Sequence, residues 1–179
     1  MDGLLKLSAA IDWLNDRVGK AVYWLVLVAV VVSAGNAVVR YSLNMSSNAW
    51  LEIQWYLFSA VFLLCAGYTF LHNEHIRIDI VSSRMSPQAR NWMDVFGHLV
   101  FLLPLCVVML FEAWPYFMNA FRSGEVSSSA GGLIRWPARL LIPAGFTLLL
   151  LQMVSELIKR FAVIRGWIPD PYGEKSGSH

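Results

Sequence analysis

The segment at residues 72–87, HNEHIRIDIVSSRMSP, is the densest group of residues in this sequence that could do chemistry. Its two histidines, His72 and His75, lie three positions apart, which raises the question of a metal site. The order of residues matches neither HExxH nor HxxEH, and no third ligand is evident nearby. Zinc is therefore a weak interpretation of this segment.

A second histidine arrangement concerns haem. His98 belongs to a later apolar run, at a depth similar to that of His72 and His75. Two histidines on facing helices at one depth could ligate a b-type haem. Only one such level exists in the sequence, and lone histidines near membrane interfaces are commoner than ligand pairs. A haem-bearing anchor subunit of a redox or photosynthetic complex thus stays an alternative.

The sequence gives no support for an enzyme. No serine or cysteine nucleophile has a recognisable local setting, and there is no glycine-rich phosphate loop. Cys65 and Cys106 each lie inside an apolar run, where a thiol behaves as a small buried hydrophobe. We therefore predict neither a catalytic residue nor a metal or other cofactor in this chain.

The composition indicates a membrane protein. Of 179 residues, 57% are hydrophobic and only 15% are charged, and the mean hydropathy is +0.53. These values fall outside the soluble range. A net charge of +2, without basic residues that alternate with aromatics, excludes nucleic acid as a partner.

Four apolar stretches are long enough to cross roughly 30 Å of hydrocarbon. We predict a single all-α membrane domain over residues 1–179, with an amphipathic helix before four transmembrane helices. Ten of the fourteen Lys and Arg residues lie in the N-terminal segment, the loop between spans two and three, and the tail. By the positive-inside rule both termini are cytoplasmic. The predicted parts are residues 1–20 (interfacial helix), 21–41, 50–71, 87–120 and 137–161 (spans), and 162–179 (tail).

The N-terminal helix has an apolar stripe. Leu4, Leu7, Ile11, Leu14 and Val18 recur at three- and four-residue steps. This pattern is typical of a helix that lies in the membrane interface. Packing of the same helix against the rest of the protein is an equally good interpretation.

Local signals mark the ends of the last two spans. Ser86 suits an N-cap, and Pro87 suits the first helical position. Pro104 and Pro115 lie inside the third span and are expected to kink it. A flexible SSSAGG loop is predicted to come next, before Trp136 opens the fourth span.

Polar residues within spans are functional candidates by default. Glu52 and Glu112 lie toward the predicted outer side, where an acid reaches headgroup water, so an interface role is favoured over transport. In span four Gly145, Gln152 and Glu156 share one helix face. Gly145 permits close approach, Gln152 can bond to another helix, and Glu156 can pair with Arg160 one turn later. This face is predicted to pack against a partner subunit or against neighbouring helices.

Transport by four helices alone is not indicated. Secondary transporters usually bind substrate at the midplane, between repeats that have broken helices in matching positions. The sequence has no internal repeat, and the middle of each span is apolar. An accessory or scaffold subunit fits better than a carrier, and a small free-standing channel is a third interpretation.

Several ordered motifs resemble the small membrane subunit, the DctQ type, of tripartite ATP-independent periplasmic (TRAP) transporters. The resemblance covers about residues 13 to 162. It is most specific at the acid that starts span two, at HIRIDI, at SGE, and in the segment from RWP to IPAGF. The residues concerned are Glu52, His75, Arg77, Asp79, Gly124, Glu125, Arg135, Trp136, Pro137, Pro143 and Gly145.

This resemblance implies a four-helix subunit in the bacterial inner membrane, in contact with membrane lipids. Its partner would be a large M-type permease subunit that carries the sodium and substrate sites, and a periplasmic substrate-binding protein would deliver a solute such as an organic acid. The small subunit would brace the static scaffold against which the transport domain moves. In that setting Arg77 and Asp79 are predicted to orient the turn between spans two and three.

Overall fold

The structure is a computed structural model that describes residues 2–43, 47–72 and 85–169. Its regular elements within these ranges are helices, apart from one isolated β-bridge between Val126 and Ile134. Four helical segments are long and apolar enough to cross a membrane. The predicted all-α architecture with four spans is therefore confirmed.

The first span and the predicted interfacial helix form one continuous helix, α1 (Asp2–Leu43). The prediction of a separate helix over residues 1–20 is wrong, because no proline or capping sequence interrupts the chain before Leu43. Its 42 residues extend about 63 Å, twice the thickness of the hydrocarbon layer. The N-terminal half packs against the protein's own helices, which was the second interpretation of its apolar stripe.

The second span consists of α2 (Asn48–Leu64) and α3 (Ala66–Leu71), separated by a turn at Cys65. Ser47 caps α2, since its side chain accepts a hydrogen bond from the Ala49 N–H at 3.3 Å. This cap satisfies one of the free donors at the start of the helix.

The third span contains α5 (Pro87–Gly97), a π-helical turn η1 (His98–Leu102) and α6 (Leu103–Ser123). Ser86 caps α5 as predicted and accepts from the Ala89 N–H at 3.3 Å. The π-helical turn directly precedes Pro104, which cannot donate the hydrogen bond of a regular helix. Around Pro115, in contrast, α6 continues without interruption.

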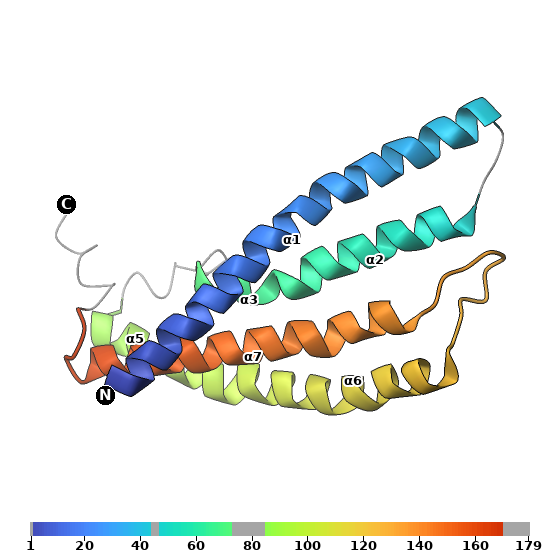
Figure 1. Cartoon of the computed structure of the whole chain (residues 1–179). Coiled ribbons are helices and arrows are strands. Elements are labelled where there is room, and N and C mark those ends of the chain that lie inside the picture. The colour runs from blue at the N-terminus through green and yellow to red at the C-terminus, as the bar shows by residue number, and fades with distance from the viewer. Residues whose placement is uncertain (1, 44–46, 73–84, 170–179) are drawn as a thin grey trace.

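The fourth span, α7 (Trp136–Ile164), is the central element. It packs against α1, α2, α3, α5 and α6, whereas α1 and α6 lie on opposite sides of it (Figure 1). The start of α1 and the end of α7 lie at one end of the bundle, which we call the terminal end (Figure 1). The end of α1, the start of α2 and the connection between α6 and α7 lie at the opposite end, which we call the loop end (Figure 1).

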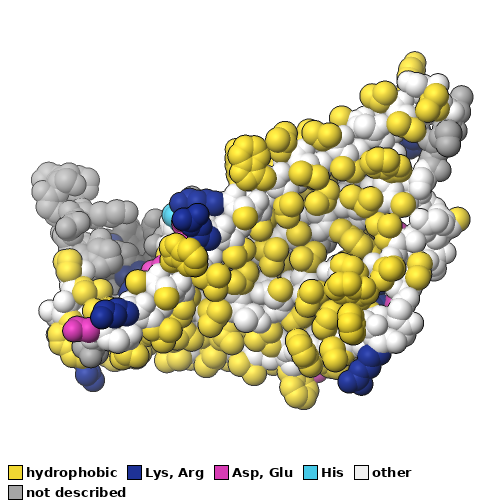
Figure 2. All heavy atoms as spheres, in the orientation of Figure 1, with side chains coloured by type: hydrophobic (Ala, Val, Ile, Leu, Met, Phe, Trp, Pro, Cys, Tyr) yellow, Lys and Arg dark blue, Asp and Glu magenta, His cyan; other side chains and the backbone are white. Residues whose placement is uncertain are grey.

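Apolar side chains cover the outside, and polar ones occupy much of the interior. Figure 2 shows hydrophobic side chains over most of the visible face of the helices. The largest fully buried side chains include three amides and a serine as well as Met153 and Cys106. This distribution suits a protein whose solvent is lipid, because helices in a bilayer associate through close packing and hydrogen bonds.

Candidate functional site

The connection between α6 and α7, residues 124–135, is an ordered hairpin at the loop end. The Ser127 N–H donates to the Leu133 carbonyl, and the Arg135 N–H donates to the Glu125 carbonyl, both at 2.9 Å. Gly124 and Gly131 have φ angles of 61° and 71°, which glycine adopts without strain. The flexible loop predicted from SSSAGG is therefore wrong, because the turn closes on paired backbone.

Glu52, in the first turns of α2, holds this hairpin. Its Oε2 accepts the Leu133 N–H at 2.7 Å, and its Oε1 accepts the Ser127 hydroxyl. One turn later the Tyr56 hydroxyl donates to the Ile134 carbonyl at 3.2 Å. The acid is thus a structural anchor at the loop end of the bundle. Its position at the membrane interface stays a prediction.

Glu125 joins the hairpin to α7 and α6. Its Oε1 accepts from Arg139 at 2.6 Å and from Arg135 at 3.3 Å. The guanidinium of Arg139 also lies 4.0 Å from the ring centroid of Tyr116 in α6. Charge-assisted bonds of this kind are stronger than neutral ones, so they fix the orientation of the hairpin.

Four residues of the family motifs therefore meet at the loop end. Glu52 binds the hairpin, and Glu125 and Arg135 pair within it. The Trp136 ring packs edge-on against Phe121 at 5.5 Å between centroids. All four hold the chain together where α2 and α7 begin and α6 ends. We call this group the hairpin cluster.

We expect Glu52→Ala to loosen the hairpin without unfolding the bundle. The two acceptors that Leu133 and Ser127 use would be lost, and both donors would turn to water. Trypsin cleavage after Arg135 should then become several times faster in detergent. Glu52→Gln keeps one acceptor oxygen, so its cleavage rate should lie between those of the wild type and Glu52→Ala. Equal cleavage rates in all three proteins would contradict the anchor role.

A second polar group, the terminal cluster, joins α1 to α7 at the terminal end. The Asp12 carboxylate accepts from Gln152 at 2.8 Å and from Ser155 at 2.6 Å, and Lys159 pairs with it at 3.1 Å. The Ser8 hydroxyl lies 2.7 Å from the Ser155 hydroxyl. This confirms the predicted cross-helix role of Gln152, with α1 as its neighbour.

Asn15 completes the terminal cluster. Its amide donates to Gln152 Oε1 at 2.9 Å, and only 1% of the residue is exposed. The amide oxygen lies against Gly67, where an added Cβ would be 2.1 Å away. In the same way, a Cβ on Gly145 would lie 2.6 Å from the Leu63 carbonyl oxygen. Gly67 thus lets α1 approach α3 closely, and Gly145 lets α2 approach α7 closely, the role predicted for Gly145.

The ion pairs of α7 differ in detail from the prediction. Glu156 pairs with Lys159 rather than with the predicted Arg160 among the contacts of the described residues. Arg160 instead reaches Asp94 at 3.3 Å and the Asn91 amide oxygen at 3.1 Å. Asp94 and Asn91 belong to α5, so these contacts tie the start of the third span to the end of the fourth.

The histidines of the haem hypothesis make other contacts. The His98 ring is buried and lies edge-on to Phe70, 5.1 Å between centroids. The His72 ring lies 4.2 Å from the Tyr68 ring, and its Nδ1 is 3.0 Å from the Tyr68 carbonyl oxygen. Within the described ranges no three His, Cys, Asp or Glu residues gather as metal ligands would. His75, Arg77 and Asp79 lie outside the described residues.

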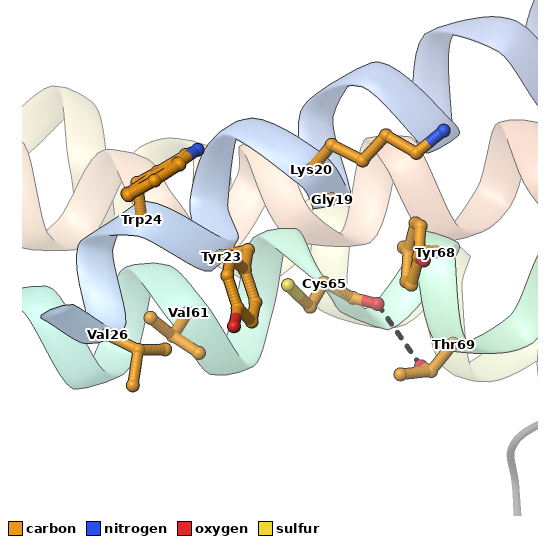
Figure 3. A pocket seen from close by; sticks show the side chains of 9 residues that line it. All are labelled: Gly19, Lys20, Tyr23, Trp24, Val26, Val61, Cys65, Tyr68 and Thr69. Carbon is orange, nitrogen blue, oxygen red and sulfur yellow. Dashed lines mark hydrogen bonds between the residues drawn. The ribbon is translucent and has the colours of Figure 1, made fainter.

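A groove of about 430 Å³ separates the middle of α1 from α2 and α3. Figure 3 shows Tyr23 of α1 beside Cys65, and the Thr69 hydroxyl bonded to the Cys65 carbonyl. Lys20 lies at the edge, where its ammonium pairs with Asp16 at 2.6 Å. The groove therefore offers packing surface, and its Thr69 hydroxyl and Lys20 ammonium are already engaged within the chain.

Sequence reasoning missed the partners of the residues that it selected. Asp12 and Asn15 were not singled out, although they carry the terminal cluster. Their spacing of three, with Ser8 four positions earlier, is a helical polar stripe that could have revealed them. Arg139 carried no such signal, because its partners come from a loop and another helix.

The comparisons with known proteins agree with this picture. A family model described as "Tripartite ATP-independent periplasmic transporters, DctQ component" matches residues 28–163. That range contains the hairpin cluster and the α7 half of the terminal cluster. The searches against curated proteins and against solved structures found no match.

Proposed function

The chain belongs to the DctQ component family of tripartite ATP-independent periplasmic transporters, and from this premise we propose that it braces a large permease subunit. Membership makes it a multi-pass small membrane subunit of such a transporter, a transport component rather than a member of an enzyme family. The finer role proposed is that of a static support against which the moving part of the permease works.

The family match over residues 28–163 carries this proposal. The architecture supports it, because polar clusters lock α7 to α1 at one end and to α2 and α6 at the other. A support must resist displacement when its neighbour moves. Two locked ends on a central helix give that resistance.

The surroundings of the subunit follow from the same proposal. We place it in the bacterial inner membrane, with the terminal end in the cytoplasm as the charge distribution of the sequence predicts. The sodium and substrate sites belong to the large subunit, and a periplasmic binding protein delivers the solute, for which an organic acid is the expected class. Membrane lipids cover the remaining apolar surface.

Co-expression with the large subunit tests the proposal. We expect the two chains to purify together from native membranes, and solute uptake in proteoliposomes to require both chains, a sodium gradient and the binding protein. The large subunit alone should give little or no uptake. Full uptake without this chain, or no recovery of the permease with it, would contradict the bracing role.

The redox-anchor alternative makes a different prediction for the same preparation. It requires a haem absorbance band and a co-purifying redox protein. The family match gives it no support, and a free-standing channel has none either. The identity of the co-purifying chain separates all three interpretations.

A further inference from the structure

Glu112 is an acid on the outer surface of a membrane-spanning helix. It is exposed in α6, in an apolar surrounding that includes Phe111 (77% exposed) and Val108 (58%). In α2, α5 and α7 the acids Glu52, Asp94 and Glu156 each have a partner within the chain. Glu112 makes no hydrogen bond or ion pair with any residue that the structure describes.

The sequence alone favours an interface position for Glu112, but in the structure Glu112 lies one turn farther from the end of α6 than the residue over which the Arg139 guanidinium lies. α6 ends at Ser123, about 16 Å farther along the helix axis. The charged level at this end is marked by Arg139, whose guanidinium lies over Tyr116, one turn closer to that end. Glu112 is therefore one turn deeper than the charged level, where an ionised side chain is costly unless it has a partner.

The surface around Glu112 is a shallow, largely apolar hollow of about 480 Å³, in which the Glu112 carboxylate and the Asn119 amide supply hydrogen-bond acceptors. Asn119 lies two turns along the same face, so its side chain lines the hollow together with the carboxylate. Pro115 lies between them and has no N–H to donate to the Phe111 carbonyl. The remaining lining residues are Met109, Ala113, Tyr116 and, from α7, Ile142.

We propose that this hollow on α6 receives a basic side chain, Lys or Arg, from a transmembrane helix of the large permease subunit. The carboxylate and the adjacent acceptors call for a cationic donor. A lipid headgroup would carry its ammonium at the level of Arg139 and not one turn deeper, so a protein helix is the better source. This inference rests on the proposed function, and it assigns one face of the small subunit to the partner.

The test uses the intact pair of subunits, co-expressed and purified through a tag on the small one. Glu112→Leu should lower the recovered large subunit about tenfold, the loss expected for one bond to a charged group. Glu112→Gln keeps an acceptor and should lose less. The matched control is Val107→Leu, an exposed position on α6 about 140 degrees around the helix from Glu112, which should recover the partner fully.

Two further measurements separate the inference from a folding defect and from the proposed function. The isolated Glu112→Leu chain should melt at the wild-type temperature in detergent, because no described residue loses a bond. A photocrosslinking phenylalanine analogue at position 119 should label the large subunit, and the same analogue at 107 should label lipid. Normal recovery for Glu112→Leu, or labelling of lipid only at 119, overturns the inference while the wild-type pair still supports the function. Failure of the wild-type pair itself overturns the function.

Discussion

Gly145→Leu is expected to be the most damaging single substitution in this chain. Gly145 lies where α7 crosses α2, and even an added Cβ would be 2.6 Å from the carbonyl oxygen and 2.9 Å from the carbonyl carbon of Leu63. Those atoms are helix backbone, so they cannot rotate away as a side chain would. The two helices must separate, and the contacts around the crossing loosen together.

The expected cost is about 3 kcal/mol or more, at the upper end of the range for overpacked cores. Thermal unfolding of the isolated chain in detergent measures it, and Gly145→Ala should give a smaller loss in the same direction. Gly35 in α1 is the matched control, since a Cβ there would meet nothing within 4 Å. If Gly35→Leu and Gly145→Leu unfolded at the same temperature, close approach at Gly145 would not matter for stability.

The helical period of the sequence located this crossing, but it could not name the partner. Gly145 and Gln152 lie on one face of α7 however the helices pack, because seven residues are close to two turns of 3.6 residues. Which helix meets each of them depends on how the four spans assemble. Gly145 meets α2, and Gln152 meets α1, seven residues farther along the same helix.

The N-terminal half of α1 shows where the usual pattern misleads. Leu4 and Leu7 of the predicted apolar stripe are 48% and 50% exposed, although Ile11 of the same stripe is buried. The polar Ser8 and Asn15 are buried as well. In water the apolar side of a helix turns inward. In a membrane the apolar side of a helix can face lipid without cost. Small or polar side chains then turn inward, where they form hydrogen bonds and pack closely.

The contacts of the hairpin cluster could not be predicted from local sequence patterns, for a different reason. Glu52 and the Leu133 N–H that it accepts are 81 positions apart, so no spacing rule connects them. Family resemblance marked Glu52, Glu125 and Arg135 as belonging to motifs, without their geometry. Glu52, the acid predicted at the start of the second span, and Glu125 of the SGE motif thus both hold the same hairpin in place.

Gln152→Leu is the second substitution from which we expect a large effect. Gln152 has no exposed surface, donates to Asp12 at 2.8 Å and accepts from Asn15 at 2.9 Å. Leucine fills the space but leaves both partners with one bond fewer. Hydrogen bonds between membrane helices average only about 0.6 kcal/mol, whereas a buried group left unsatisfied costs about 1 to 3 kcal/mol. Asp12 keeps its bonds to Ser155 and Lys159, and the Asn15 amide still donates to the Ile11 carbonyl. Neither partner is left wholly unsatisfied, so we expect a loss of about 1 to 2 kcal/mol.

A control on the same helix separates this bond loss from a general effect of removing polarity. The exposed Thr147 hydroxyl donates to its own helix, at the Pro143 carbonyl, 2.7 Å away, so Thr147→Val should change stability by less than about 0.5 kcal/mol. If Gln152→Leu were as mild, the terminal cluster would contribute little.

The double variant Asn15→Leu with Gln152→Leu decides whether the terminal cluster acts as a unit. Asn15 and Gln152 bond directly, so the second substitution removes a group that the first has already left without its partner. The combined loss of unfolding free energy should therefore be smaller than the sum of the single losses, by about 1 kcal/mol. Strict additivity in thermal or denaturant unfolding would mean that the two amides stabilise α1 and α7 separately. A coupled pair would instead make the contact between α1 and α7 all-or-none, which is the property that a rigid support needs.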